Sequence, residues 1–376
     1  MTKDVKGTRV RAGILLLTMA GLAATACAGG GDKKDGTDTS AAMMSAAGQP
    51  ADKAPEKMAE PDAEMQAVLD EHAALGAKPL ETLTPQEARK GPSPADAVKS
   101  LLQKQGKPTA PEPVGKVVNR TIPGPAGQIK VRIYTPKGTG PFPVIVYYHG
   151  GGWVIADLDT YDASARGLTN GANAIVVSSH YRQGPENKFP AAHDDAWAAY
   201  EWTVKNAASF GGDTARLAIA GESAGGNLAA FVAMTARDKK WKMPSHQLLV
   251  YPIASSDMNS SSYIENANAK PLSKAGMEWF AKHALNTPED ANDWRVSLLK
   301  GDMKGLPATT IVLAQIDPLR SDGRALGEKL KDAGVDTEIK QWDNVAHEFF
   351  GMGAVHPKAK DAMAYASGRL KSALQR

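Results

Sequence analysis

The sequence predicts an α/β protein with a mostly parallel central sheet flanked by helices. From about residue 117 onward, short β-rich runs alternate with segments of helix length, a pattern typical of parallel sheets covered by helices on both sides. Several of the runs are continuously apolar, as in strands that are buried on both faces. The 376 residues are 42% hydrophobic and 23% charged, which excludes wholesale disorder and a polytopic membrane protein.

Residues 1–26 have the layout of a secretory signal. A basic start precedes the apolar run 12–26, which is shorter than the roughly 20 residues of a membrane span. Small residues close the run, and Cys27, the only cysteine, follows directly. The pattern resembles a bacterial lipobox and predicts an exported lipoprotein, lipidated at Cys27, membrane-anchored and facing the periplasm or cell exterior. The usual lipobox has leucine where Ala24 stands, so secretion as a soluble protein and an uncleaved anchor are the alternatives.

The formal charge of +3 lies in this same segment, which holds four basic side chains and one acidic one. The rest of the chain is formally neutral, whereas a nucleic-acid binder needs a basic surface that displaces counterions. We therefore expect no nucleic-acid partner. With a single cysteine, the body can form neither a disulfide nor a cysteine metal site, and we expect no metal or cofactor.

The segment 27–60 consists largely of small, charged and proline residues without apolar periodicity, which is typical of a disordered tether. From about residue 61 apolar residues recur at helical spacing. Two further helical segments are expected at 85–90 and 94–105. We assign 61–115 to helices packed on the main domain, and 116–376 to that α/β domain.

Seven runs are the expected strands of the α/β domain. They are 129–134, 144–148, 174–179, 216–220, 247–251, 309–314 and 336–342. Parallel sheets place their chemistry at the carboxyl ends of the strands. The residues that directly follow each run are therefore the candidates for a functional site.

A serine motif follows the fourth run. Gly221-Glu222-Ser223-Ala224-Gly225 matches G-x-S-x-G between a strand and a helical segment, the setting of a nucleophile elbow. The serine must sit on a sharp turn, where flanking glycines relieve crowding, and the following helix amino end favours developing negative charge. The alternative is a plain glycine-rich turn.

Three glycines follow the second run, in His149-Gly150-Gly151-Gly152-Trp153. Adjacent glycines at a strand end leave backbone N–H groups free to point into a cavity, as an oxyanion hole requires. Alone the motif would indicate a flexible loop, but the serine motif later in the chain strengthens the catalytic interpretation.

A serine nucleophile needs a base, usually a histidine held by a carboxylate. Of the eight histidines, His347 follows the last expected strand and also follows the serine, as the order serine, acid, histidine demands. Asp317 lies just beyond the run 309–314, at the edge where the acid belongs. Asp322 is the competing acid, although it is expected within the following helix.

Together these residues resemble the hormone-sensitive-lipase-like esterases, the bacterial family IV type, which have the α/β-hydrolase fold. The resemblance covers about 61–376. It rests on motifs in a fixed order, namely His149-Gly150-Gly151-Gly152-Trp153, Tyr181-Arg182 with Pro185-Glu186, Phe189-Pro190-Ala191-Ala192, Gly221-Glu222-Ser223-Ala224-Gly225-Gly226-Asn227, Asp317-Pro318-Leu319-Arg320 and His347. The resemblance implies a serine carboxylesterase with an N-terminal helical cap over 61–115.

For the residues themselves, the resemblance implies that Ser223 is the nucleophile, His347 the base and Asp317 its orienting acid. The oxyanion hole is expected from the N–H groups of three residues, Gly151, Gly152 and Ala224. The expected substrates are small-molecule esters of short to medium acyl chains. Three departures from the family pattern are Glu222 for aspartate, Gln183-Gly184 for Leu-Ala, and Glu348 for glycine.

Other interpretations stay open. The same triad could hydrolyse amides or lactones, and receptors of this fold that lack the histidine show that a non-catalytic ligand-binding protein is conceivable. Ser297 begins an S-x-x-K match, but its companion motifs are absent. The pair Asp194-Asp195 is interpreted as structural. The helical segment 273–285 carries Met277, Trp279 and Phe280, which are expected to pack rather than to face the acyl pocket.

Overall fold

The computed structural model describes residues 57–375. The expected signal peptide, Cys27 and most of the expected tether lie outside these residues. The described part contains one eight-stranded sheet with the order β1-β2-β4-β3-β5-β6-β7-β8. Its strands are β1 Lys116–Gly124, β2 Gly127–Thr135, β3 Phe142–Tyr148, β4 Ile175–Ser179, β5 Gly212–Glu222, β6 His246–Val250, β7 Ala308–Ile316 and β8 Thr337–Ala346.

The sheet is mostly parallel, which confirms the predicted fold class. β1 pairs antiparallel with β2, and β2 antiparallel with β4, whereas every other pair is parallel. β1 is the one strand that the sequence pattern missed among those described. It lies at the edge of the sheet and buries only Ile122, so it lacks the apolar run by which the other strands were recognised.

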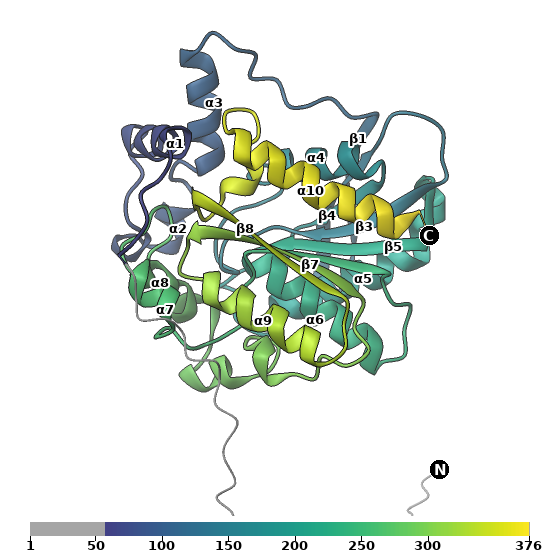
Figure 1. Cartoon of the computed structure of the whole chain (residues 1–376). Coiled ribbons are helices and arrows are strands. Elements are labelled where there is room, and N and C mark those ends of the chain that lie inside the picture. The colour runs from purple at the N-terminus through teal and green to yellow at the C-terminus, as the bar shows by residue number, and fades with distance from the viewer. Residues whose placement is uncertain (1–56, 376) are drawn as a thin grey trace, which may run out of the picture. The chain divides into compact units, whose positions relative to one another are not determined.

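Side chains that alternate along the strands form two cores, one on each face of the sheet. Val144 and Val146 of β3 face the core beneath α5, α6 and α9, whereas Ile145 and Tyr147 face the core beneath α4 and α10. Figure 1 shows these two sets of helices on opposite sides of the strands. Their bounds are α4 Asp162–Ala172, α5 Ala191–Asn206, α6 Ala224–Asp238, α9 Arg320–Asp332 and α10 Pro357–Leu374.

The N-terminal helices and the segment between β6 and β7 lie together at one end of the strands (Figure 1). We call α1 Ala63–Ala74, α2 Pro85–Ala88 and α3 Pro94–Lys104 the cap helices. Between β6 and β7 come α7 Ser261–Glu265 and α8 Lys274–Ala284. The short 3-10 helices are η1 Leu80–Thr82, η2 Ala207–Phe210, η3 Pro288–Asn292, η4 Leu298–Lys300 and η5 Phe349–Gly351.

Local sequence signals define where the cap helices begin. The Thr84 and Ser93 side chains each form a capping box with the acid three residues later, and a proline follows each at the first helical position. These contacts satisfy backbone N–H groups that a helix start otherwise leaves unpaired. Met65 and Val68 bury one face of α1, so the expected helical spacing from residue 61 is observed.

The cap helices are joined to the body by a small number of polar contacts. Arg89, the residue after α2, donates to the carbonyl oxygens of Val154 (2.8 Å) and Gly184 (2.5 Å) and pairs with Glu186. Asp62, at the start of α1, accepts from His356 at 2.9 Å. These contacts hold α1 and α2 against segments that are far away in the sequence.

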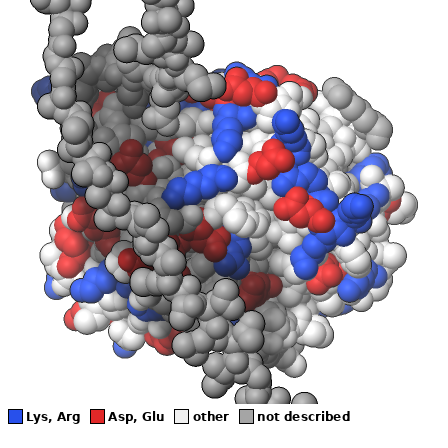
Figure 2. All heavy atoms as spheres, turned by 90° about the horizontal axis from the view of Figure 1, so that it is seen from below, with Lys and Arg blue, Asp and Glu red and all other residues white. Residues whose placement is uncertain are grey.

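On the face seen in Figure 2, positive and negative side chains are interspersed wherever the described atoms are visible. This distribution contrasts with the continuous basic surface of nucleic-acid binders. No helix within 57–375 is both long and apolar enough to span a bilayer. In the same range, no group of three or more His, Cys, Asp or Glu is placed to hold a metal ion.

Candidate active site

Ser223 sits on a sharp turn between β5 and α6, with φ 56° and ψ −120°. Two close backbone approaches force this turn. A Cβ at Gly221 would lie 2.0 Å from the Gly225 oxygen, and one at Gly225 would lie 2.1 Å from the Tyr148 oxygen. Only glycine fits at either position, so the G-x-S-x-G spacing follows from sterics. The turn places the serine hydroxyl at the carboxyl end of the sheet and the α6 amino end directly behind it.

Asp317 and His347 follow the two neighbouring strands β7 and β8. The structure brings them together with Ser223. His347 Nδ1 lies 2.7 Å from Asp317 Oδ2, and His347 Nε2 lies 3.0 Å from Ser223 Oγ. In the neutral tautomer that these partners favour, Nδ1–H donates to the carboxylate and the serine hydroxyl donates to Nε2. Asp317 is itself oriented, because its Oδ1 accepts from the Leu319 N–H.

The pKa of His347 is raised above its ordinary 6.5. Burial favours the neutral ring and lowers the pKa, but the charge of Asp317, its hydrogen bond and the charge of Glu348 outweigh burial. The ring also lies against Tyr251, with centroids 4.4 Å apart. Packing and hydrogen bonds together fix the orientation of the imidazole.

The competing acids are occupied elsewhere. Asp322 accepts from the backbone N–H groups of Ala254 (3.1 Å) and Ser255 (2.8 Å), and burial raises its pKa to about 8. Asp195 forms a bidentate pair with Arg182 at 2.8 Å. Both aspartates therefore hold backbone and side chains in place at a distance from the His347 ring.

The expected oxyanion groups border the same site. No hydrogen bond within the described part of the chain uses the N–H of Gly151, Gly152 or Ala224. Gly151 and Gly152 both have positive φ, 96° and 57°. A Cβ at Gly151 would lie 2.2 Å from the Ile155 oxygen, so the loop folds back tightly on itself. This folding leaves the N–H groups without internal acceptors.

Aromatic side chains support the glycine loop from behind. The Tyr181 hydroxyl donates to the carbonyl oxygens of His149 and Gly150, both at 2.9 Å. His149 Nε2 lies 3.0 Å from His180 Nδ1, and burial lowers the pKa of His149 to about 3. His149 is therefore a neutral, structural residue. These contacts hold the carbonyl groups away from the site.

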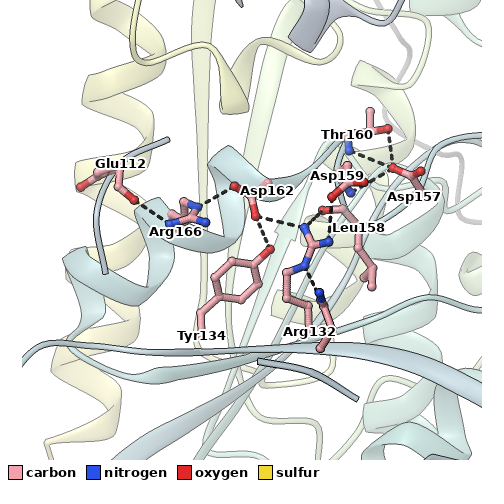
Figure 3. Close-up of polar contacts among 10 residues, drawn as sticks. Glu112, Arg132, Tyr134, Asp157, Leu158, Asp159, Thr160, Asp162 and Arg166 are labelled. Carbon is pink, nitrogen blue, oxygen red and sulfur yellow. Dashed lines mark hydrogen bonds and ion pairs between the residues drawn. The ribbon is translucent and has the colours of Figure 1, made fainter. Parts of the chain in front are cut away.

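A polar network fixes the segment that connects the glycine loop to α4 (Figure 3). Arg132 of β2 pairs with Asp159 (2.7 Å) and Asp162 (3.2 Å). Asp162 also accepts from Tyr134 at 2.6 Å and pairs with Arg166 at 2.5 Å. Arg166 in turn donates to the Glu112 carbonyl at 2.9 Å and so ties the linker after α3 to α4.

The site opens into a cleft of about 1540 Å³ between the cap helices and the body. This volume exceeds the 300–1,000 Å³ of ordinary ligand pockets. Its inner part is lined by apolar side chains and by Ser223 and His347. The lining of this inner part includes Leu80, Leu83, Gly151, Gly152, Ile155, Ser223, Leu272, Phe280, His347 and Glu348.

Phe280 packs in the core, as expected, and its ring also lines the cleft. A Cβ on Gly152 would lie 2.2 Å from the Phe280 ring, so the ring covers the glycine. Trp279 instead donates its indole N–H to the Leu83 carbonyl at 2.8 Å and so ties α8 to the cap. Met277 is buried in the core, 5% exposed. All three share one short helix, and only tertiary contacts distinguish them.

Two carboxylates beside the triad were noticed in the sequence only as departures from a pattern. Glu222 is buried beneath Ser223 and accepts from Tyr147 and Tyr251, both at 2.6 Å, and burial raises its pKa to about 7. Glu348 lies in the cleft and accepts from Tyr161 at 2.5 Å. The strand-end pattern predicts functional residues directly after each strand. That pattern contains no signal for the contacts of Glu222 and Glu348 with the tyrosines.

Comparison with known proteins places this geometry in a family. Residues 145–351 match the model of the α/β-hydrolase fold family. The chain is an α/β-hydrolase. Over 251 residues it is 40% identical to the carboxylesterase NlhH of Mycobacterium tuberculosis, covering 65% of this chain and 79% of that protein. Over 240 residues it is 32% identical to ethyl acetate hydrolase of Pseudomonas putida, covering 62% of this chain and 76% of that relative.

Solved structures agree with the sequence matches. The esterase of Pyrobaculum calidifontis superposes on this α/β-hydrolase with a TM-score of 0.75 at 32% identity, covering 84% of this chain and 99% of that one. The expected membership of the hormone-sensitive-lipase-like esterases is confirmed, and the chain is a carboxylic ester hydrolase with a small-molecule ester substrate.

Proposed function

We propose that this α/β-hydrolase cleaves short- to medium-chain acyl esters by serine catalysis. Ser223 is the nucleophile, His347 the base, and Asp317 the acid that orients it. The observation that carries the proposal is the continuous chain of hydrogen bonds from Asp317 through His347 to the Ser223 hydroxyl. This series of hydrogen bonds ends at the Ser223 hydroxyl, which lies in an open cleft beside backbone N–H groups that have no internal acceptor.

The proposed reaction has two halves. His347 Nε2 takes the Ser223 proton as the oxygen attacks the ester carbonyl, and then gives that proton to the departing alcohol. The tetrahedral oxyanion is stabilised by the N–H groups of Gly151, Gly152 and Ala224, each worth about 10²-fold or more in rate. Water, deprotonated by the same histidine, then releases the acid from the acyl-enzyme. No step requires a metal or cofactor.

The mechanism predicts how activity depends on pH. His347 works as a base only in its neutral form, and its pKa lies above 6.5. The kcat/KM for a neutral ester should therefore rise with pH through a single ionisation above 6.5 and level off beyond it. A profile that is flat between pH 5 and 8 under chemistry-limited conditions would contradict the role of His347.

The test is hydrolysis of p-nitrophenyl esters of increasing acyl length by the full-length chain and by Ser223→Ala. We expect turnover of the shorter esters, and a loss on the order of 10⁴-fold or more in the variant. Activity that survives the substitution would assign the chemistry to another serine. Parallel assays on a lactone and an anilide separate ester hydrolysis from the lactone and amide alternatives.

We further propose that the enzyme is exported as a lipoprotein anchored through Cys27. The support is the sequence of residues 1–27, with its basic start, apolar run and small residues before the cysteine. Mass spectrometry of the mature amino terminus tests the proposal. A mature chain that begins with an unmodified Cys27 would indicate a secreted soluble protein instead.

A further inference from the structure

Glu348 occupies a costly backbone position directly after the histidine. Its φ is 73°, in the left-handed region where residues other than glycine are uncommon. Glycine would adopt this conformation without strain. A side chain that is kept where glycine fits more easily points to a role for the side chain itself.

The carboxylate of Glu348 points into the cleft beside the reacting atoms. Its Oε1 accepts from the Tyr161 hydroxyl and lies 3.8 Å from His347 Nε2. The side chain remains 21% exposed, and it lines the same cleft as Ser223. Within residues 57–375 no hydrogen bond occupies Oε2, so that oxygen is available to a bound molecule.

The charge of Glu348 is not balanced by a cation of the protein. In the described part of the chain its ionic partner is His347, and it pairs with no lysine or arginine. Burial raises the pKa of Glu348 above its ordinary 4.5, although the charge of His347 and the Tyr161 hydrogen bond oppose the shift. When His347 is neutral, three carboxylates, Asp317, Glu222 and Glu348, therefore lie around the reaction centre without a compensating charge at pH 8. Asp317 and Glu222 are both buried, which leaves Glu348 as the carboxylate that a substrate meets.

The position of Glu348 indicates which half of an ester it meets. His347 Nε2 must deliver its proton to the departing alcohol oxygen, so a group 3.8 Å from Nε2 lies beside the alcohol half rather than at the acyl end. We propose that Glu348 selects esters whose alcohol half carries a positive charge and disfavours those whose alcohol half is anionic. The inference rests on the proposed function, because it assigns the alcohol side from the role of His347.

The experiment compares two butyrate esters of the same shape, those of choline and of 3,3-dimethylbutanol, in which carbon replaces the charged nitrogen. The kcat/KM of each is measured at pH 8 and low ionic strength for the wild-type chain and for Glu348→Gln. The readout is the choline-to-dimethylbutyl ratio, compared between the two enzymes, because the different intrinsic reactivities of the esters cancel in that comparison.

We expect the ratio to fall about 10-fold in Glu348→Gln, which is the effect of losing one partly screened charge contact. Glu348→Asp should keep part of the preference, and 0.5 M salt should weaken the wild-type preference. The control is Glu278→Gln, which removes the same charge from the exposed face of α8 and should keep the wild-type ratio.

An unchanged ratio in Glu348→Gln would overturn the inference, even if the variant were slower on both esters, because a merely structural role affects both equally. A wild-type chain that hydrolyses p-nitrophenyl butyrate but not the choline ester would also overturn it while leaving the esterase chemistry intact. A chain inactive on all three esters would overturn the proposed function, and the inference with it.

Discussion

The strand ends that carry the triad differ from the cap helices in how many contacts fix them. His347 is held by Asp317 and packed against Tyr251, and Asp317 is held in turn by a backbone N–H. The short helix α2, in contrast, depends largely on Arg89 for its polar attachment to the body. The three triad side chains are buried at the strand ends, whereas α2 buries only Pro85.

Because of this difference, the reaction and the choice of substrate depend on different parts of the molecule. Groups that must keep sub-ångström geometry directly follow strands whose positions are fixed by the sheet. Groups that shape the cleft sit on short helices and loops, where a change of side chain alters substrate choice without disturbing the reaction centre. Substitutions in the two regions should therefore produce different kinetic signatures.

The largest expected effect is at the strand ends. Asp317→Asn should lower kcat by about 10⁴-fold, because the amide cannot hold the correct His347 tautomer. Asp322→Asn is the matched control, since its remaining oxygen can still accept from Ala254 and Ser255, and it should stay within a few-fold of wild type. Steady-state assays on p-nitrophenyl butyrate measure both. Equal losses would mean that the acid was assigned to the wrong aspartate.

A smaller effect is expected from the cleft wall. Phe280→Leu opens space over Gly152 and should raise the octanoate-to-butyrate ratio of kcat/KM by about 10-fold. This is the discrimination that one or two methylene groups give in an apolar pocket. Met277→Leu replaces a buried side chain of the same helix with another apolar side chain, and it should leave the octanoate-to-butyrate ratio unchanged. If both variants shift the ratio alike, the effect arises from α8 as a whole and not from the Phe280 ring.

The cap attachment should affect binding more than chemistry. Arg89→Ala removes the hydrogen bonds to Val154 and Gly184, and we expect KM to rise about 5-fold with a smaller change in kcat, together with a loss of about 1 to 3 kcal/mol of stability. Arg324→Ala, on α9, removes an exposed arginine as control. A fall in kcat alone would show that the cap contributes to the reaction geometry.

The smallest effect concerns stability and pH. The pKa of Glu222 is about 7 in the folded chain, above its ordinary 4.5, so the unfolded chain releases its proton first as pH rises. Stability is therefore lost between about pH 4.5 and 7, and the loss is complete above pH 7. Glu222→Gln removes this penalty and should raise the thermal midpoint by several °C at pH 8, but hardly at pH 5.

Calorimetry at the two pH values tests this expectation, with Glu278→Gln as an exposed control. A Glu222→Gln variant that is destabilised equally at both pH values would show that Tyr147 and Tyr251 need the carboxyl group in either protonation state. Glu222 would then belong with Asp317 and His347 to the region that hydrogen bonds hold in place.

Much of the site was predictable from sequence because its signals are local. The turn at Ser223 requires glycine at two fixed offsets, and Asp317 and His347 directly follow strands whose apolar runs are recognisable. The order of these elements along the chain is enough to expect the three residues at one edge of a parallel sheet. The edge strand β1 escaped recognition because an exposed strand has no apolar run to mark it.

The sequence by itself determined which residues could react, since backbone sterics and strand ends are properties of short segments. Only the tertiary structure decided between neighbours. Asp317 reaches His347 while Asp322, five residues later, holds a loop, and Phe280 faces the cleft while Trp279 binds the cap. The physical reason is that these choices depend on which segment packs alongside, and residues distant in the chain supply that segment.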